Sequence, residues 1–323
     1  MNIFVVQDEK EIMCIMILGA SGYLGSNITE YFSKKGYNVI CVVRPTSNIS
    51  RLRELPCHII SSELNQVELF FSQDQVDWVI NGVATYKPND SLYGDMFASN
   101  VTFPLSILNL AIRYGIKNFM TMGTGLPDNF NMYSFTKAKF SDFGKYLSEK
   151  HKINFVDLRL EMFYGGKFEP DQKFMKASIL RLISGTMLEL TEGSQMRDII
   201  HMDDVLKLIE RLIKSQFVKG YRILPVGTGE KHAIKDIITY LARKYNSKSE
   251  IKFGAVETRP EEPDTLADIS WYSEIGFNQM YSYFEGLDLE YENIQAGFHG
   301  GVFYNLIFVG RNVYDFDGSR WCA

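Results

Sequence analysis

Tyr133 and Lys137 lie four residues apart in the segment YSFTK, a spacing that puts both side chains on one face of a helix. A phenol ordinarily has a pKa of about 10, too high for acid–base catalysis at neutral pH. A nearby ammonium favours the phenolate and brings proton transfer by a tyrosine into range. Because Tyr/Lys pairs at this spacing are common on protein surfaces, their meaning depends on the elements that surround them.

A glycine-rich turn follows the apolar run Ile12–Leu18 and opens a segment of helical period. Gly19 permits a tight turn, Gly22 lets the backbone approach a diphosphate, and Gly25 allows close packing of helix on strand. The helix N-terminus would then offer N–H groups to the phosphates. This GxxGxxG context predicts a dinucleotide site. The residues expected at it are Gly19, Ser21, Gly22, Tyr23, Leu24 and Gly25.

The end of the second predicted strand indicates which dinucleotide is bound. An acidic residue at this place would hold the ribose 2′-hydroxyl of NAD. The sequence has Arg44 there, followed by hydroxyl residues, and no acid before Glu54. Since a guanidinium pairs well with a phosphate, we expect NADP(H) to be preferred over NAD(H).

Strand-length apolar runs alternate with helical segments through the first half of the chain, which predicts an α/β fold with a Rossmann-like, doubly wound parallel sheet. Strands are expected at 12–18, 38–43, 57–60, 76–81, 117–122 and 154–158, and helices at 23–35, 67–71, 92–114 and 133–151.

The second half is less regular and is expected to form a smaller substrate lobe. Helices are expected at 174–183, 202–214 and 234–244, and strands at 187–190 and 221–226. The proposed division is a cofactor-binding domain over 1–160 with later elements interleaved, a substrate lobe over 161–278, and a tail over 279–323. The tail, rich in Phe, Tyr and Gly, has no predicted structure or role.

Composition excludes several classes of function. A net charge of -5 argues against nucleic-acid binding. The run Ile12–Leu18 is too short to span a bilayer, and no signal peptide precedes it, so no membrane association is expected. The four cysteines lack CxxC spacing, which favours a reducing compartment, and we expect a cytoplasmic enzyme. The scattered histidines predict no metal site.

These motifs in this order resemble the extended short-chain dehydrogenase/reductase superfamily, also called the NAD-dependent epimerase/dehydratase family. The resemblance covers about residues 12–275 and implies a third catalytic residue, Thr124, with Thr121 as the alternative. It also implies cofactor-site roles for Asn81, Ala84, Asn100, Lys137 and Phe163. Asn100 matches a mid-helix asparagine with a structural, relay-supporting role. Arg197, in the segment RDIIHMDD, matches an arginine that contacts the diphosphate of a nucleotide-sugar substrate.

Two departures from the family pattern narrow the chemistry. Gly125 and Leu126 follow Thr124, where dehydratases of the family carry an acidic pair, so sugar 4,6-dehydration is disfavoured. Met162 stands where many relatives have an asparagine on the substrate phosphates.

The strings 126–134, 161–165 and 191–198 resemble a subgroup of bacterial surface-polysaccharide reductases, the CDP-abequose synthase-like enzymes. The resemblance implies NADPH-dependent reduction of a 4-keto-deoxy nucleotide sugar for O-antigen synthesis. Two alternatives stay open: a 4-epimerase that retains its dinucleotide, and a non-catalytic NADP-sensing regulator. By family analogy, the predicted helices 92–114 and 133–151 could pair across a twofold axis in a homodimer.

Overall fold

The computed structural model describes residues 12–73, 76–86, 93–257, 262–299, 312–314 and 320–322. Its centre is a parallel sheet of seven strands in the order β11-β6-β5-β4-β1-β2-β3. The strands are β1 (Cys14–Leu18), β2 (Asn38–Val43), β3 (His58–Ser61), β4 (Trp78–Asn81), β5 (Asn118–Thr124), β6 (Asn154–Leu160) and β11 (Tyr221–Val226). The order reverses between β1 and β4, which is the Rossmann topology, so the predicted fold class is confirmed.

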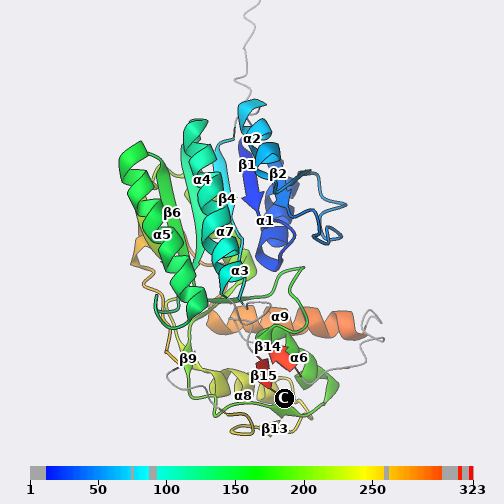
Figure 1. The fold of residues 1–323 in the computed structure, drawn as a ribbon. Helices are drawn as coiled ribbons and strands as arrows, with labels where there is room; N and C mark the ends of the chain where they lie inside the picture. Colours follow the sequence, from blue (N-terminus) through cyan, green and yellow to red (C-terminus); the bar gives the residue numbers. More distant parts are fainter. Residues whose placement is uncertain are drawn as a thin grey trace, which may run out of the picture.

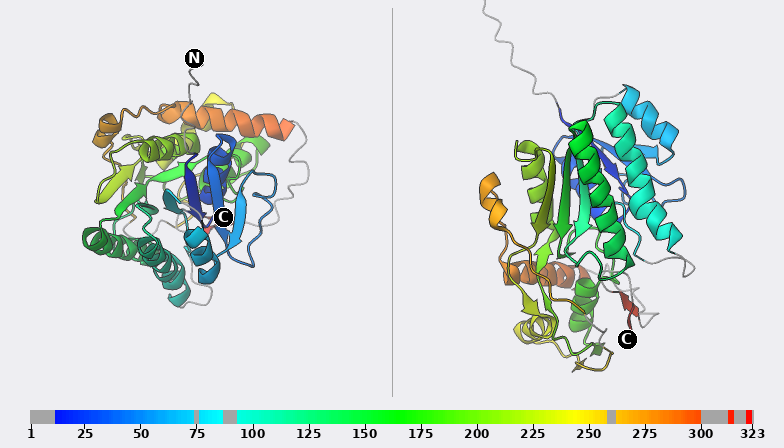
Figure 2. Two further views of the ribbon diagram at one scale, coloured as in Figure 1. Left: turned by 90° about the horizontal axis from the view of Figure 1, so that it is seen from above. Right: turned by 60° about the vertical axis from the view of Figure 1, so that its left-hand side comes forward.

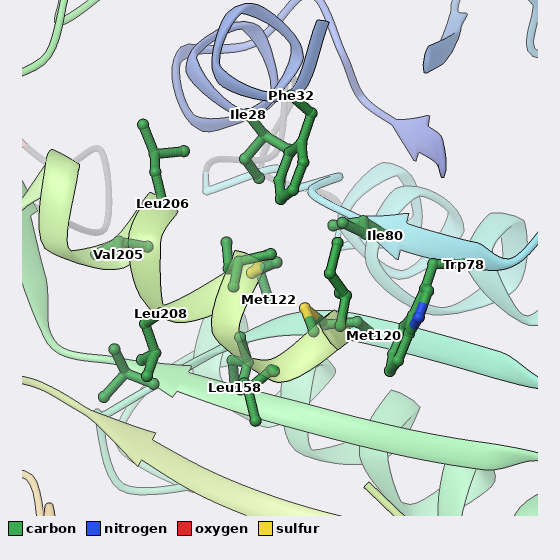
Figure 3. Close-up of a cluster of buried hydrophobic side chains, with 14 of the residues drawn as sticks. Ile28, Phe32, Trp78, Ile80, Met120, Met122, Leu158, Val205, Leu206 and Leu208 are labelled. Atoms are coloured by element: carbon green, nitrogen blue, oxygen red, sulfur yellow. The ribbon is translucent and has the colours of Figure 1, made fainter. Parts of the chain in front are cut away.

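Helices cover both faces of the sheet (Figures 1 and 2). One face carries α1 (Tyr23–Lys34) and α7 (Met202–Lys214), and the other carries α2 (Leu64–Gln73), α4 (Phe103–Arg113) and α5 (Met132–His151). Alternate residues of each central strand therefore enter different cores. Figure 3 shows the first of these, where Ile28 and Phe32 of α1 approach side chains of α7, β4, β5 and β6. Burial on both faces explains why these strands are apolar runs.

The helix predicted over residues 92–114 is interrupted. The structure has α3 (Gly94–Phe97), a π-helical turn η1 (Ala98–Thr102) and then α4, with Pro104 in its first turn. Proline has no N–H to donate to the preceding turn, which accounts for the break in the helical ladder at this point. Leu92 lies outside the described residues.

The second half of the chain contributes to both layers of the molecule. β11 pairs with β6 at the sheet edge and α7 packs against α1, whereas α6 (Phe174–Ser184), α8 (Ile234–Lys244) and α9 (Tyr283–His299) form a lobe below the sheet in Figure 1. Short strands complete the lobe and its junction with the sheet. They are β7 (Met162–Tyr164), β8 (Leu188–Glu189), β9 (Met196–Arg197), β10 (Ile199–His201), β12 (His232–Ala233), β13 (Ile251–Lys252), β14 (Asn312–Tyr314) and β15 (Arg320–Cys322), with the 3₁₀ helix η2 (Ser270–Ile275).

Helix α9 belongs to the segment for which the sequence pattern predicts no structure. Tyr283, Leu287, Tyr291 and Ile294 of this helix are buried in the core of the lobe. Their spacing is helical, and the packing of this apolar stripe against α6 and α8 places the helix. Within the described residues, no helix is both long and apolar enough to cross a membrane.

Candidate functional site

Two adjoining cavities lie at the carboxyl ends of the sheet strands, where ligands bind in open α/β folds. Their volumes are about 390 Å³ and about 190 Å³, and both are lined by Gly22, Gly82 and Ala84. Among the predicted site residues, the larger is also lined by Gly19, Ser21 and Arg44, and the smaller by Tyr23, Leu24, Tyr133, Lys137 and Phe163. The structure thus brings most of the predicted cofactor residues into one groove together with Tyr133 and Lys137, two of the three predicted catalytic residues.

The glycine loop forms a cradle that side chains would fill. Gly19 has a φ of +73° and makes the turn from β1, and a Cβ there would lie 3.1 Å from the Val83 nitrogen. A Cβ on Gly25 would lie 2.3 Å from the Gly19 carbonyl oxygen, so this glycine is required for α1 to approach the loop. Gly22 is the N-cap of α1 and lines both cavities. A diphosphate could therefore approach the backbone and the first N–H groups of α1.

Arg44 lines the larger cavity at the end of β2. Ser47 and Ser62 line the same cavity, and no acidic side chain does so within the described part of the chain. The exposed guanidinium and the two hydroxyl residues make this end of the cavity suited to an anion.

A capping box fixes Tyr133 at the start of α5. The Ser134 backbone N–H donates to Asn131 Oδ1 over 2.8 Å, and the Asn131 N–H donates to Ser134 Oγ over 3.2 Å. The Tyr133 ring lies 4.6 Å from the Tyr86 ring between centroids. The phenol is therefore held at the wall of the smaller cavity by its own helix terminus.

Lys137 is buried one helical turn after Tyr133. Its Nζ donates to the carbonyl oxygens of Val83 and Met122, each over 2.8 Å, and lies 5.9 Å from the centre of the Tyr133 ring. Burial lowers the pKa of Lys137 to about 8, and the carboxylate of Asp157 opposes this shift. An ammonium is thereby held close to the phenol.

Thr124 ends β5, is almost fully buried, and lines neither cavity. Its hydroxyl accepts a hydrogen bond from the Leu126 N–H over 3.3 Å. The alternative residue, Thr121, lies deeper in the sheet and accepts a hydrogen bond from Asn81 Nδ2 over 3.0 Å. Met122 and Gly123, which lie between the two threonines, line the smaller cavity, so its lining does not distinguish Thr124 from Thr121.

Asn81 and Asn100 are buried and hold the loop that lines the groove. Asn81 Oδ1 accepts from the Val83 N–H over 3.2 Å. Asn100 Oδ1 accepts from the Thr85 N–H over 2.8 Å, and its Nδ2 donates to the Thr85 carbonyl and to Thr136 Oγ1, each over 3.0 Å. Neither asparagine lines a cavity, so both act here through the backbone of residues 82–86.

Arg197 does not line either cavity. Its guanidinium forms an ion pair with Glu262 and donates to the Pro263 carbonyl. Glu161, which the sequence analysis missed, lies nearby: burial raises its pKa to about 7, while the Thr265 hydroxyl and Arg197 oppose the shift. Its Oε1 would lie 2.3 Å from a Cβ on Gly125, so its carboxyl group occupies the space beside that glycine.

Lys173 and Tyr86 are cavity residues that sequence reasoning also missed. Both line the smaller cavity, and Lys173 Nζ lies 5.1 Å from the centre of the Tyr86 ring. Lys173 is the N-cap residue of α6, so the lobe contributes a cation to the cavity mouth. On the same wall, Tyr23 stacks on Phe163 with centroids 5.4 Å apart. Nothing in the sequence around Lys173 indicates that a lysine before a helix would line the cavity.

Comparisons with known proteins agree with this architecture. The model of the NAD dependent epimerase/dehydratase family matches residues 15–227, and the chain belongs to this family, as its motifs predict. The chain is 27% identical to CDP-abequose synthase of Salmonella typhimurium over 289 residues, covering 85% of this chain and 96% of that protein.

Two solved structures have the same fold. The UDP-glucose 4-epimerase of Thermotoga maritima, solved with UDP-glucose, has a TM-score of 0.76 at 18% identity, covering 88% of this chain and all (100%) of that chain. The UDP-glucuronic acid 4-epimerase of Bacillus cereus, in complex with UDP-glucuronic acid and NAD, has a TM-score of 0.73 at 21% identity, covering 88% and 99%.

Proposed function

We propose that this protein uses NADPH to reduce the 4-keto group of a nucleotide-linked deoxyhexose, in the synthesis of a surface-polysaccharide precursor. The observation that carries the proposal is the joint lining of the smaller cavity by Tyr133 and Lys137, beside a larger cavity that ends at Arg44. The similarity to CDP-abequose synthase supports a nucleotide sugar as substrate.

The groove fits a nicotinamide dinucleotide. Gly19, Gly22 and the start of α1 would hold the diphosphate, because a Cβ in this loop would meet backbone atoms. Arg44 and Ser47 would hold the 2′-phosphate that distinguishes NADP(H) from NAD(H). When bound, NADPH supplies the hydride for the carbonyl carbon.

The protein side chains supply the proton and hold the carbonyl oxygen. Tyr133 donates its phenolic proton to that oxygen, so the ketone becomes a secondary alcohol. The Thr124 hydroxyl donates a hydrogen bond to the same oxygen as negative charge develops on it. The Lys137 ammonium stabilises the phenolate that Tyr133 leaves behind, and solvent returns the proton after product release.

Lys173 and Arg197 are proposed to meet the substrate diphosphate from the lobe. Lys173 already lies at the mouth of the smaller cavity. Arg197 would have to exchange its pairing with Glu262 for the substrate phosphates. Since Met162 offers no hydrogen bond where many relatives have an asparagine, Lys173 is expected to contribute the larger share of diphosphate binding.

The test is NADPH oxidation with a CDP-linked 4-keto-deoxyhexose, run in parallel with NADH and followed by identification of the product. We expect NADPH to be oxidised faster than NADH. Arg44→Ala should weaken NADPH binding by about 10–100-fold, since charged hydrogen bonds contribute about 1.5–3 kcal/mol, and should leave NADH binding nearly unchanged. Arg53→Ala, which removes another exposed arginine, is the control. Equal losses for both cofactors would contradict the role of Arg44.

The same assay distinguishes a 4-epimerase. Conversion of a nucleotide sugar to its epimer without net NADPH oxidation, together with a dinucleotide that copurifies, would replace the reductase proposal. Binding of NADPH with no turnover of any nucleotide sugar would indicate the non-catalytic sensor.

A further inference from the structure

Asp157 is a buried carboxylate in the middle of β6 that the mechanism above does not use. Its side chain is almost fully buried, and its Oδ1 accepts no hydrogen bond from the described part of the chain. Its Oδ2 lies 3.5 Å from Arg159 Nε. A buried carboxylate oxygen without a donor costs stability, so its presence calls for a compensating interaction.

The carboxylate lies directly behind the wall of the smaller cavity. A Cβ on Gly123 would lie 2.1 Å from Asp157 Oδ1, and Gly123 is one of the residues that line this cavity. The Lys137 Nζ donates to the carbonyl of Met122, the residue before Gly123. Asp157 and Lys137 therefore adjoin consecutive residues of β5, Gly123 and Met122, and the absence of a side chain at position 123 leaves room for the carboxylate.

The charges around this pair favour a charged lysine. Burial lowers the pKa of Lys137, and among the residues that the structure describes Asp157 opposes the shift. Burial raises the pKa of Asp157, whereas Ser141, Arg159 and Lys137 lower it.

Other titratable and charged groups lie on the elements packed around this pair. Asp128 pairs with the outer side of Arg159 at 2.8 Å, and Tyr133 is the neighbour on α5 itself. Asp142 on α5 and Tyr221 on β11 interact with each other, and Tyr221 also interacts with Asp157.

We propose that Asp157 is a positioning residue that, from behind Gly123, keeps the side chain of Lys137 charged beside Tyr133. It acts through Lys137, because Gly123 separates it from the cavity. This inference rests on the proposed function only for its effect on turnover, because the charge coupling itself can be measured without substrate.

The first experiment is an NMR titration of the full-length protein without cofactor, using lysine labelled with ¹³C at Cε. The Lys137 signal is assigned by its loss in Lys137→Met. We expect a midpoint near pH 8 in the wild type. Asp157→Asn, which keeps the shape, should lower the midpoint by about one unit, the lower end of the range for a neighbouring opposite charge.

Asp128→Asn is the matched control, because it removes the outer partner of Arg159 and leaves Asp157 in place. Its Lys137 midpoint should equal that of the wild type. If Asp157→Asn does not fold, Asp157→Ser removes the charge with less bulk. An unchanged Lys137 midpoint in the folded Asp157 variant would overturn the inference, whatever the reaction proves to be.

The second readout is the pH profile of kcat for NADPH-dependent reduction. Loss of the Lys137 ammonium should reduce kcat as pH rises, so the alkaline limb should move down by about one pH unit in Asp157→Asn, with KM for NADPH little changed. A uniform loss at every pH would indicate a purely structural role and contradict the inference. Absence of reduction in the wild type would refute the proposed function alone.

Discussion

At the scale of single residues, the site depends on one side chain fixed by its own helix terminus and another fixed by carbonyls of distant segments. The Asn131–Ser134 capping box sets the first turn of α5, and Tyr133 lies within that turn. The Val83 and Met122 carbonyls then anchor Lys137 one turn later. Local sequence therefore sets the spacing of the pair along α5, whereas contacts with distant segments hold the lysine in place.

Tyr133→Phe removes the proposed proton donor and keeps the ring that packs on Tyr86. We expect kcat to fall by about 10²–10⁴-fold, the usual contribution of a positioned acid, while the Kd for NADPH changes little. Steady-state kinetics and cofactor fluorescence titration measure the two quantities. Tyr146→Phe, an exposed tyrosine on the same helix, is the control and should behave like the wild type. Near-wild-type turnover in Tyr133→Phe would remove this residue from the mechanism.

At the scale of elements, the junction of β1 and α1 depends on the absence of a side chain at position 25. Gly25→Ala would place a Cβ 2.3 Å from the Gly19 carbonyl and 2.8 Å from the Ala20 Cα. Since backbone must shift, we expect a loss of about 1–3 kcal/mol in unfolding free energy and weaker dinucleotide binding. Thermal unfolding and NADPH titration test this. Gly94→Ala is the control: a Cβ there meets open space, so stability and dinucleotide binding should change little. A Gly25→Ala variant that is as stable as the wild type and binds the cofactor equally well would contradict the packing argument.

Much of the sheet layer could be predicted from the sequence because the central strands are apolar runs buried on both faces. The predicted strand 38–43 and helices 202–214 and 234–244 match the structure at both ends. The π-helical turn within the 92–114 helix could not be read from hydrophobic period, since Pro104 is tolerated in a first turn and the backbone stays helical on both sides of the π-helical turn. Helix α9 was missed because its apolar stripe lies among further aromatic and glycine residues, and because its partners on α6 and α8 are distant in sequence.

The site was predictable where a motif carries its own geometry. Gly19, Gly22, Tyr133 and Lys137 belong to such motifs, and the structure brings them into one groove. Lys173, Asp157 and Glu161 could not be found in this way, because their positions depend on contacts between elements distant in sequence. For Asp157 and Glu161, the glycines at positions 123 and 125 were the one sequence feature that could have pointed to them, since each glycine leaves room for a buried carboxyl group.

At the scale of the whole molecule, a buried acidic pair lies at the junction of the sheet and the lobe. Glu169 Oε2 accepts the Gly165 N–H over 2.9 Å, while Tyr23 of the glycine loop donates to the Gly165 carbonyl over 2.6 Å. Burial raises the pKa of Glu169 to about 8, and Glu290 of α9 adds to the shift. Through Gly165, the glycine loop is therefore hydrogen-bonded to a segment that also holds Glu169, a carboxyl group with a raised pKa.

The raised pKa predicts a pH-dependent stability. The folded state holds the Glu169 proton up to about pH 8, whereas the unfolded chain releases it near its ordinary value of 4.5. The favourable contribution is thus complete below pH 4.5 and is lost as pH rises through 8. Relative to Glu169→Gln, the wild type should lose about 2–4 kcal/mol of unfolding free energy between pH 5 and pH 9, measured by urea titration. Glu149→Gln, at an exposed position, is the control; parallel curves for Glu169→Gln and wild type would refute the assignment.

The surface of α5 bears on the homodimer predicted from family analogy, which we keep as a proposal. Phe143 and Tyr146 on this helix are 42% and 60% exposed. If two copies pair through α4 and α5, sedimentation should give a mass near twice 37.1 kDa, and Tyr146→Glu should weaken the association. Leu69→Glu on α2 is the control for an added surface charge. A monomeric wild type at micromolar concentration would rule out the proposed pairing.

The central claim, that this chain transfers a hydride to a nucleotide-linked keto sugar with Tyr133 as the proton donor, is tested most directly by isotope transfer. NADPH carrying deuterium at the nicotinamide C4, prepared separately as each stereoisomer, would be incubated with a CDP-linked 4-keto-deoxyhexose. We predict that one stereoisomer places deuterium at C4 of the hexose, with one NADPH consumed per product, and that Tyr133→Phe strongly slows the transfer. Product formed without deuterium, or without NADPH consumption, would contradict the account.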